Sequence, residues 1–251
     1  NTNADRYRLT EDEILECAKN GYELGFRTIV LQSGEDPYYN DDRICSIISR
    51  IKAELDVAIT LSIGEKSEES YRKYKEAGAD RYLLRHETSN NEHYARLHPA
   101  NLSGEHRKEC LKTLKNLGYQ VGAGFMVGSP YQTVSNLAED LIYLKELNPH
   151  MVGIGPFIAH HDTTFADMAN GTIEDTLLLL SLIRIMIPDV LLPATTALGT
   201  ISPTGREQGI KAGANVVMPN LSPITVRKKY DLYDKADVNQ IFEIYNEELS
   251  V

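Results

Sequence analysis

The segment RYLLRHETSN, residues 81–90, has the pattern of a buried strand that ends in charged side chains. An apolar run at residues 82–84 is followed at once by Arg85, His86 and Glu87. Because side chains alternate along a strand, Arg85 and Glu87 are expected to share one face and His86 the other. In a barrel of parallel strands and helices, the carboxyl ends of the strands line the active-site mouth. The segment therefore predicts a parallel α/β fold in which Arg85 and Glu87 face the interior, at a functional site or as a structural ion pair.

The alternation of strand and helix repeats along the chain. Apolar runs predict seven strands, at residues 28–34, 57–64, 81–87, 120–128, 151–158, 191–199 and 214–220. Amphipathic stretches predict helices between them, at residues 10–25, 42–55, 67–78, 105–118, 133–147 and 174–187. Residues that favour helix starts or ends delimit several stretches, namely Thr10, Ser67, Ser103, Gly25, Gly78 and Gly118. Near-continuous apolar strands separated by helices indicate a sheet buried on both faces.

These elements predict an α/β fold of the TIM-type (βα) barrel class, in a single domain over residues 1–251. A closed parallel barrel has eight βα units, whereas this chain opens with a helical stretch before the first of its seven strands. We therefore expect a first strand upstream of Asn1, in a longer protein of which this chain is a part. The alternative is an open sheet or a natural partial barrel.

Composition and charge exclude several classes of function. The 251 residues carry a formal net charge of −10, and no basic stripe interleaved with aromatic residues occurs, so nucleic acid is not an expected partner. No apolar stretch has the length of a membrane span, and the chain does not open on a signal-peptide pattern. The cysteines Cys17, Cys45 and Cys110 are scattered, without disulfide or metal-ligand spacing, which fits a cytoplasmic protein.

Small and sulfur-containing residues mark the predicted fourth and seventh strands. Gly122, Gly124 and Gly128 leave room either for a flat ring lying on the backbone or for a closely packed helix. Met126 and Met218 are candidate ligand contacts, although methionine is also a common core-filling residue.

Polar residues follow the later strands. Thr195 and Thr196, placed in the predicted sixth strand, would suit a carboxylate or another anion, or serve only as strand formers. His160, His161 and Asp162 offer metal-ligand atoms, but adjacent histidines in an extended segment face opposite ways. Residues 205–220 have some features of a barrel phosphate site, without a clear Gly-Gly turn.

Taken together, seven segments resemble the HydE family of radical S-adenosylmethionine (SAM) maturases of FeFe-hydrogenase. They are TIVLQSGEDPYY (28–39), TLSIGE (60–65), GADRYLLRHETSN (78–90), GYQVGAGFMVGSPYQT (118–133), HMVGIGPFIAHHDT (150–163), PATTALGTISPTGRE (193–207) and GANVVMPNLSP (213–223). They cover almost the whole chain in the family's order. Methylornithine synthase is a near relative with the same barrel, and biotin synthase a more distant one.

The resemblance implies a βα barrel that holds a 4Fe-4S cluster and SAM, and that forms a 5′-deoxyadenosyl radical to attack a small substrate. In this family the chemistry helps to build the hydrogenase di-iron subcluster, with other maturases as possible partners. By the resemblance, the SAM-binding residues are Gly34, Glu35, Glu87, Arg107, Gly124, Met126 and Gly128. The residues that line the substrate cavity are Ser62, Arg85, Thr195, Thr196, Met218 and Tyr233.

One departure from the family concerns the cluster itself. The family holds its cluster with a C-x3-C-x2-C loop after the first strand, and this chain contains no such motif. RYRLT, residues 6–10, matches the segment that follows the loop, so the cluster cysteines are expected upstream of Asn1 and no metal ligand is expected here. Two alternatives stay open: a methylornithine synthase-like mutase, and a non-catalytic barrel that binds a small anionic metabolite.

Overall fold

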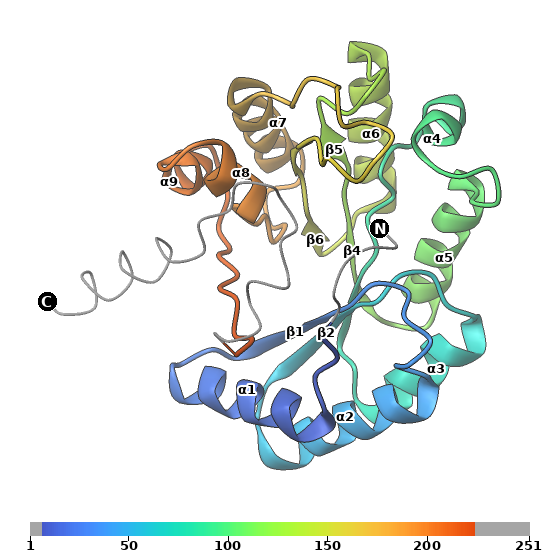
Figure 1. Ribbon diagram of the computed structural model, residues 1–251, viewed down its shortest axis with the longest axis vertical. Helices are drawn as coiled ribbons and strands as arrows, with labels where there is room; N and C mark the ends of the chain where they lie inside the picture. The colour runs from blue at the N-terminus through green and yellow to red at the C-terminus, as the bar shows by residue number, and fades with distance from the viewer. Residues whose placement is uncertain (1–6, 224–251) are drawn as a thin grey trace, which may run out of the picture.

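A parallel sheet organises the computed structural model, which describes residues 7–223 (Figure 1). The sheet runs in chain order through β1 (Thr28–Gln32), β2 (Ala58–Ser62), β3 (Arg81–Leu83), β4 (Gln120–Ala123) and β6 (Met151–Val152). A second parallel pair, β5 (Met126–Val127) and β7 (Gly155–Pro156), follows β4 and β6. Isolated bridges extend the order from Met151 to Leu191 and from Pro193 to Val216. This succession of parallel strands is that of a βα barrel.

Helices connect the strands on the outside of this sheet (Figure 1). They are α1 (Glu11–Glu23), α2 (Asp41–Glu54), α3 (Glu68–Ala77), α4 (Asn91–Leu97), α5 (Gly104–Asn116), α6 (Val134–Leu147), α7 (Ile173–Met186), α8 (Thr196–Ile201) and α9 (Gly205–Lys211). The six helices expected from the sequence are all present, and α4, α8 and α9 are additional.

The helix boundaries follow the predicted signals. Thr10, Ser67 and Ser103 are N-caps whose side chains accept a hydrogen bond from the third helical backbone N–H. Gly78 closes α3 in the left-handed conformation with φ of 116°, a conformation that glycine adopts without steric cost. These local signals fix where each connection turns back towards the strands.

The predicted sixth and seventh strands are wrong in extent. Residues 191–199 pair with their neighbours only at Leu191 and Pro193, and α8 begins at Thr196. Thr195 is therefore an N-cap and Thr196 a helical residue, whereas the sequence placed both in a strand. A short apolar run does not distinguish a strand from a buried helix, and threonine is itself a favoured N-cap residue. Among the described residues of the seventh run, only Val216 forms a bridge.

The predicted fourth and fifth strands are each divided in two. The backbone leaves the ladder between β4 and β5 at Gly124, where φ is 156°, and between β6 and β7 at Gly153 and Ile154. The amide of Gly153 still bonds to the carbonyl of Ala123, so the divided strands stay side by side. The backbone therefore changes direction where these strands approach the mouth of the barrel.

The last described residues return to the start of the fold. The Leu221 side chain lies where a Cβ on Gly21 of α1 would be, with its Cδ1 2.6 Å from that position. Figure 1 shows this segment descending from α8 and α9 to the region of α1 and β1. No strand pairing joins Val216 to β1 within residues 7–223, so the expected additional strand stays a prediction.

A cluster of buried tyrosines supports the strand ends near α3 and α5. The rings of Tyr71 and Tyr82 lie edge to face with centroids 5.0 Å apart, and those of Tyr82 and Tyr119 with centroids 5.9 Å apart. The Tyr82 hydroxyl donates to the carbonyl of Gly64 at 2.8 Å, and the Tyr71 hydroxyl accepts from the amide of Lys66 at 3.0 Å. The core thereby holds the loop that follows β2 in a defined position.

Candidate functional site: the carboxyl ends of the strands

The chain after β3 alternates between two environments. Tyr82, Leu84 and His86 are buried against the helices, whereas Arg85 and Glu87 are only partly buried. Arg85 shares the face of Arg81 and Leu83, which line the barrel interior together with residues of β2, β4 and β6. The expected orientation of Arg85 and Glu87 towards the interior is therefore confirmed, although β3 itself ends at Leu83.

Arg85 and Glu87 form an ion pair across this inner face. Arg85 Nη2 lies 3.1 Å from Glu87 Oε2. The N–H groups do not point at the carboxylate, so Nε and Nη2 of Arg85 are buried without a hydrogen-bond partner among the described residues. A buried donor without an acceptor is costly, and this arrangement favours an additional anionic group at Arg85.

The backbone of Glu87 adopts an uncommon conformation. Its φ is +67°, in the left-handed region. Its amide donates to the carbonyl of Gly124 at 3.0 Å, and Glu87 bridges Phe125 on the neighbouring segment. Such a conformation costs on the order of 1–3 kcal/mol and persists where the surroundings impose it. With this backbone, the Glu87 carboxylate lies beside the guanidinium of Arg85.

His86 points the other way, as expected, and anchors the segment in the helix layer. Gly124 donates its backbone N–H to His86 Nδ1 at 3.3 Å, which leaves the proton on Nε2. Nε2 then donates to Oδ1 of Asp140, on α6, at 3.3 Å. The Ser89 amide also donates to Asp140 Oδ1, at 2.5 Å. Both side chains are fully buried, so they position the Arg85–Glu87 segment rather than bind a ligand.

Arg107 brings a second cation to the strand ends. It lies in the first turn of α5, donates from Nε to the carbonyl of Arg85 at 2.5 Å, and donates from Nη1 to Glu65 Oε1 at 2.7 Å. Burial acts to lower the pKa of Arg107, but the charges of Glu87 and Glu65 outweigh it and raise that pKa above its usual value. Glu65, from the loop after β2, thus completes a set of two cations and two carboxylates. The sequence noted Glu65 only as the end of the motif TLSIGE.

Gly34 and Glu35 lie at the edge of this set. Both are exposed, and Glu35 Oε1 accepts the amide of Glu65 at 3.1 Å. The Glu35 side chain occupies the space where a Cβ of Gly64 would stand, since Glu35 Cγ lies 2.4 Å from that position. Gly64 also has a φ of +81°, which favours glycine. The loops after β1 and β2 therefore touch, and Glu35 belongs to the same polar region as Arg107.

Neighbouring backbone atoms require glycine at positions 124 and 128 of the fourth run, and a side chain crowds position 122. A Cβ on Gly124 would stand 2.0 Å from the carbonyl oxygen of Gly153, and one on Gly128 would stand 2.5 Å from Gly171 Cα. A Cβ on Gly122 would meet Leu83 Cδ1 at 2.7 Å. Neither a bound ring nor a packed helix is needed to explain these residues, and adenine contact along this strand remains a prediction.

The remaining predicted residues have varied positions. Ser62 ends β2 and is half-buried, and Met126 and Met218 are half-buried as well. The hydroxyl of Thr195 is buried without a hydrogen-bond partner among described residues, 2.7 Å from where a Cβ of Gly155 would lie. Thr196 is exposed and accepts a bond from Arg206. Tyr233 lies outside the described residues.

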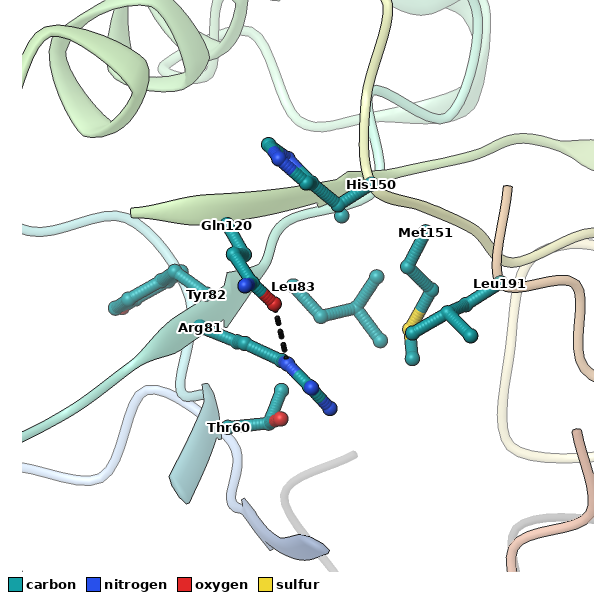
Figure 2. Close-up of a pocket in the computed structure, with 9 residues that line it drawn as sticks. Thr60, Arg81, Tyr82, Leu83, Gln120, His150, Met151 and Leu191 are labelled. Carbon is teal, nitrogen blue, oxygen red and sulfur yellow. Dashed lines mark hydrogen bonds between the residues drawn. The ribbon is translucent and has the colours of Figure 1, made fainter. Parts of the chain in front are cut away.

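A small pocket opens at the opposite end of the strands, shown in Figure 2. Arg81 donates to Gln120 Oε1 at 2.7 Å there, and to the Thr28 hydroxyl at 3.1 Å. In Figure 2 the Tyr82 side chain points away from this pocket, while Leu83, Met151 and Leu191 face into it. The pocket lies at the amino ends of β3 and β4, so it is separate from the polar set around Arg107.

The histidines after β7 form a local cluster. The rings of His160 and His161 stack with centroids 4.5 Å apart, and His161 Nε2 lies 3.5 Å from Asp162 Oδ1. All three residues offer ligand atoms to one place, although adjacent histidines were expected to diverge. The chain is in a turn there rather than extended, which explains the difference.

Comparison with known proteins identifies the family to which this chain belongs. Residues 1–144, more than half of the chain, match the model of the radical SAM superfamily. The chain belongs to the radical SAM superfamily. The matched region includes β1 to β4, and therefore Glu65, Arg85, Glu87 and Arg107.

Two individual proteins of the superfamily are similar to this chain in sequence. The chain is 54% identical, over 93% of its length, to the [FeFe] hydrogenase maturase subunit HydE of Thermotoga maritima, and covers 66% of that protein. It is 30% identical to the 3-methylornithine synthase of Methanosarcina acetivorans, over 90% of its length and 65% of the relative. The chain thus spans just under two thirds of these relatives.

Solved structures agree on the fold. The crystal structure of methylornithine synthase (PylB) matches with a TM-score of 0.79 at 27% identity, over 96% of this chain and 74% of that one. The hydrogenase maturase HydG matches with a TM-score of 0.76 at 20% identity, over 97% of this chain and 57% of that one, which shows the fold alone. The barrel class predicted from the sequence is confirmed.

The described residues fit one of the two cofactors that the family implies. The polar set offers both signs of charge, and the unpartnered nitrogens of Arg85 fit a zwitterionic ligand such as SAM. The cysteines do not fit an iron–sulfur cluster, because Cys17, Cys45 and Cys110 lie on three different helices. Within residues 7–223, no helix has the length and apolar character of a membrane span.

Proposed function

We propose that the protein containing this chain is a cytoplasmic radical SAM enzyme of the HydE type, acting in FeFe-hydrogenase maturation. The observation that carries the proposal is the polar set of Glu65, Arg85, Glu87 and Arg107 at the strand ends, in a chain 54% identical to a HydE protein. Other hydrogenase maturases would be its partners, and a small molecule its substrate.

The polar set provides the means to bind SAM. Glu87 would accept from a donor group of the ligand, and Arg107 would hold the ligand's carboxylate while Glu65 fixes the guanidinium from behind. Gly34 and Glu35 extend the set towards the ligand's amino group. Together with a reduced 4Fe-4S cluster, bound SAM would supply a 5′-deoxyadenosyl radical. The cluster ligands would come from outside the described residues.

The interior beyond this set would hold the substrate. Arg85 has Nε and Nη2 unpartnered, and the Thr195 hydroxyl is also buried without a partner among the described residues. Unsatisfied donors inside a barrel favour an anionic ligand, because its oxygens would replace the missing acceptors. The same cavity would be lined by Ser62, Thr196, Met218 and Tyr233. We therefore expect a small anionic substrate.

Activity of the full-length protein tests the proposal. Anaerobic reconstitution should give an iron–sulfur chromophore, and addition of SAM and reductant should release 5′-deoxyadenosine. The protein should also restore hydrogenase activity to a maturation mixture that lacks HydE. A fully loaded cluster without 5′-deoxyadenosine release would contradict radical SAM chemistry.

Likeness to methylornithine synthase supports a second candidate, since that structure matches over 96% of the chain. Formation of 3-methylornithine from an amino-acid mixture, with no effect on hydrogenase maturation, would favour a mutase. The third candidate, a non-catalytic barrel for an anionic metabolite, rests on the separated cysteines. It would be favoured if no cluster assembled on the full-length protein while Arg85-dependent anion binding persisted.

A further inference from the structure

Three potential metal ligands from two elements converge beside the polar set. Glu65 extends from the loop after β2, and His106 and Cys110 lie one turn apart on the same face of α5. Glu65 Oε2 is 3.6 Å from His106 Nε2, and His106 Nε2 is 3.7 Å from Cys110 Sγ. One ligand atom from each of the three residues lies within 4.8 Å of the others. The residues are separated in sequence, so their proximity arises from the fold.

Two of the three distances between ligand atoms match the edges of a tetrahedral zinc site. Zinc binds imidazole nitrogen and carboxylate oxygen at about 2.0–2.2 Å and thiolate sulfur at about 2.3 Å. The edge of such a tetrahedron is roughly 3.3–3.7 Å long. The two distances at His106 Nε2 have this length, so a metal ion could be accommodated with small movements of the side chains.

The surroundings hold each ligand in place. Glu65 Oε1 accepts from Arg107 at 2.7 Å, which turns Oε2 towards His106. The Ser103 side chain caps α5 by accepting the amide of His106, and so fixes the first turn of the helix. Burial raises the pKa of the Cys110 thiol, and a hydrogen bond from Tyr71 acts to lower it. Outer partners of this kind orient metal ligands and tune their basicity.

We propose that Glu65, His106 and Cys110 bind one zinc ion, with a fourth position open to solvent at the exposed side of His106. The thiol proton of Cys110 passes to solvent on binding, and the charges of the carboxylate and thiolate together balance that of Zn²⁺. The ion joins the loop after β2 to α5. Nitrogen, oxygen and sulfur ligands in a tetrahedral arrangement favour zinc over calcium or magnesium, which prefer oxygen alone.

The site is linked to Arg107 through the two oxygens of Glu65. A metal on Oε2 fixes the carboxylate whose Oε1 holds Arg107. If Arg107 binds SAM, which rests on the function proposed above, zinc and SAM must affect each other's affinity by the same factor. Zinc binding itself requires only the three ligands, so its test is independent of that function.

Zinc affinity of variants provides the test. The 251-residue chain is titrated with zinc against a chromophoric chelator, and His106→Asn and Cys110→Ser are compared with Cys45→Ser. Cys45 is a half-buried thiol on α2, is not among the three clustered residues, and serves as the matched control. We expect one zinc per chain, an affinity about 100-fold or more lower in the two ligand variants, and no change in the control. His106 is exposed, so its replacement leaves the fold intact.

Zinc-edge X-ray absorption gives a second measurement, on the full-length protein with its iron–sulfur cluster already loaded. Iron does not contribute at the zinc edge. We expect one sulfur neighbour at about 2.3 Å that is lost in Cys110→Ser and kept in Cys45→Ser. Equal zinc affinity in wild type and His106→Asn, or a zinc environment without sulfur, would overturn the proposal. Glu65 and His106 would then form only a side-chain contact beside a buried thiol.

Discussion

Arg85 Nη2 and Glu87 Oε2 lie 3.1 Å apart on the inner face of the segment after β3. Even so, neither Nε nor Nη2 of Arg85 donates a hydrogen bond to the carboxylate. The pair neutralises charge without completing the hydrogen bonds of Arg85. A ligand with both signs of charge could therefore engage each partner and satisfy the donors that the ion pair leaves free. The pair is a structural contact in this state and a candidate binding element at once.

Replacement of Glu87 by glutamine should weaken SAM binding. If Glu87 contacts SAM, the variant keeps the shape of the side chain but loses the charge. The expected loss is roughly 1.5–3 kcal/mol, the range for a hydrogen bond to a charged group. Calorimetric titration of the full-length, cluster-loaded protein measures it, with Glu109→Gln on the exposed face of α5 as the control. Unchanged SAM affinity in Glu87→Gln would remove Glu87 from the binding site.

Alanine at Gly124 should destabilise the barrel strongly. The new Cβ would stand 2.0 Å from the Gly153 carbonyl oxygen, and φ of 156° is unfavourable for alanine. We expect a decrease of about 3 kcal/mol in the free energy of unfolding, at the upper end for overpacking. Gly153→Ala is the matched control, because nothing lies within 4 Å of its Cβ position. Urea denaturation of both variants checks this, and similar losses would show that backbone contact at Gly124 is not the cause.

The sequence predicted six of the helices, the first three strands and the facing of Arg85, His86 and Glu87, because these depend on local periodicity. Alternation over residues 82–88 places charged residues on one face and buried residues on the other, and the structure has the same pattern. Helix starts at Thr10 and Ser67 follow from a single side chain and its third neighbour. Such features need no information from distant parts of the chain.

The features that were missed depend on contacts between distant segments. The left-handed conformation of Glu87 accompanies an amide bond to Gly124, a partner that periodicity does not reveal. The start of α8 at Thr196 instead of a strand was missed because the apolar run fits either structure and Thr195 makes no side-chain capping bond. Cys110 was not expected to be a metal ligand because the cysteines lack ligand spacing, and only the fold shows that it lies beside His106 and Glu65.

Acid should destabilise the protein in part through His98. Burial lowers the pKa of His98, against a bond to the Tyr94 carbonyl and the charge of Glu87, which act to raise it. The folded state therefore favours the neutral imidazole. This contribution to stability is complete above the unfolded pKa of about 6.5 and is lost as the pH falls through that value towards the folded pKa.

His98→Gln should remove this part of the pH dependence. The measurement is the free energy of unfolding in urea near pH 8 and near pH 5, with the expectation that the difference between the two becomes smaller in the variant. His150→Asn, which replaces a histidine at an exposed position, is the control. A pH dependence that is the same in wild type and His98→Gln would show that His98 titrates alike in both states.

Asp140 should tolerate asparagine but not alanine. Its Oδ1 accepts both the amide of Ser89 and Nε2 of His86, whereas Oδ2 is buried without a partner. Alanine leaves two buried donors without an acceptor, each costing about 1–3 kcal/mol, so Asp140→Ala should lose roughly 3 kcal/mol of unfolding free energy. Asparagine keeps the carbonyl oxygen at Oδ1 and places its amide at the unpartnered position, so Asp140→Asn should lose about 1 kcal/mol or less. Urea denaturation compares the two variants.

Because His86 anchors the Arg85–Glu87 segment, Asp140→Ala should also lower ligand affinity while Asp140→Asn should not. Equal destabilisation by both substitutions would show instead that the negative charge of Asp140, and not its acceptor oxygen, holds the segment.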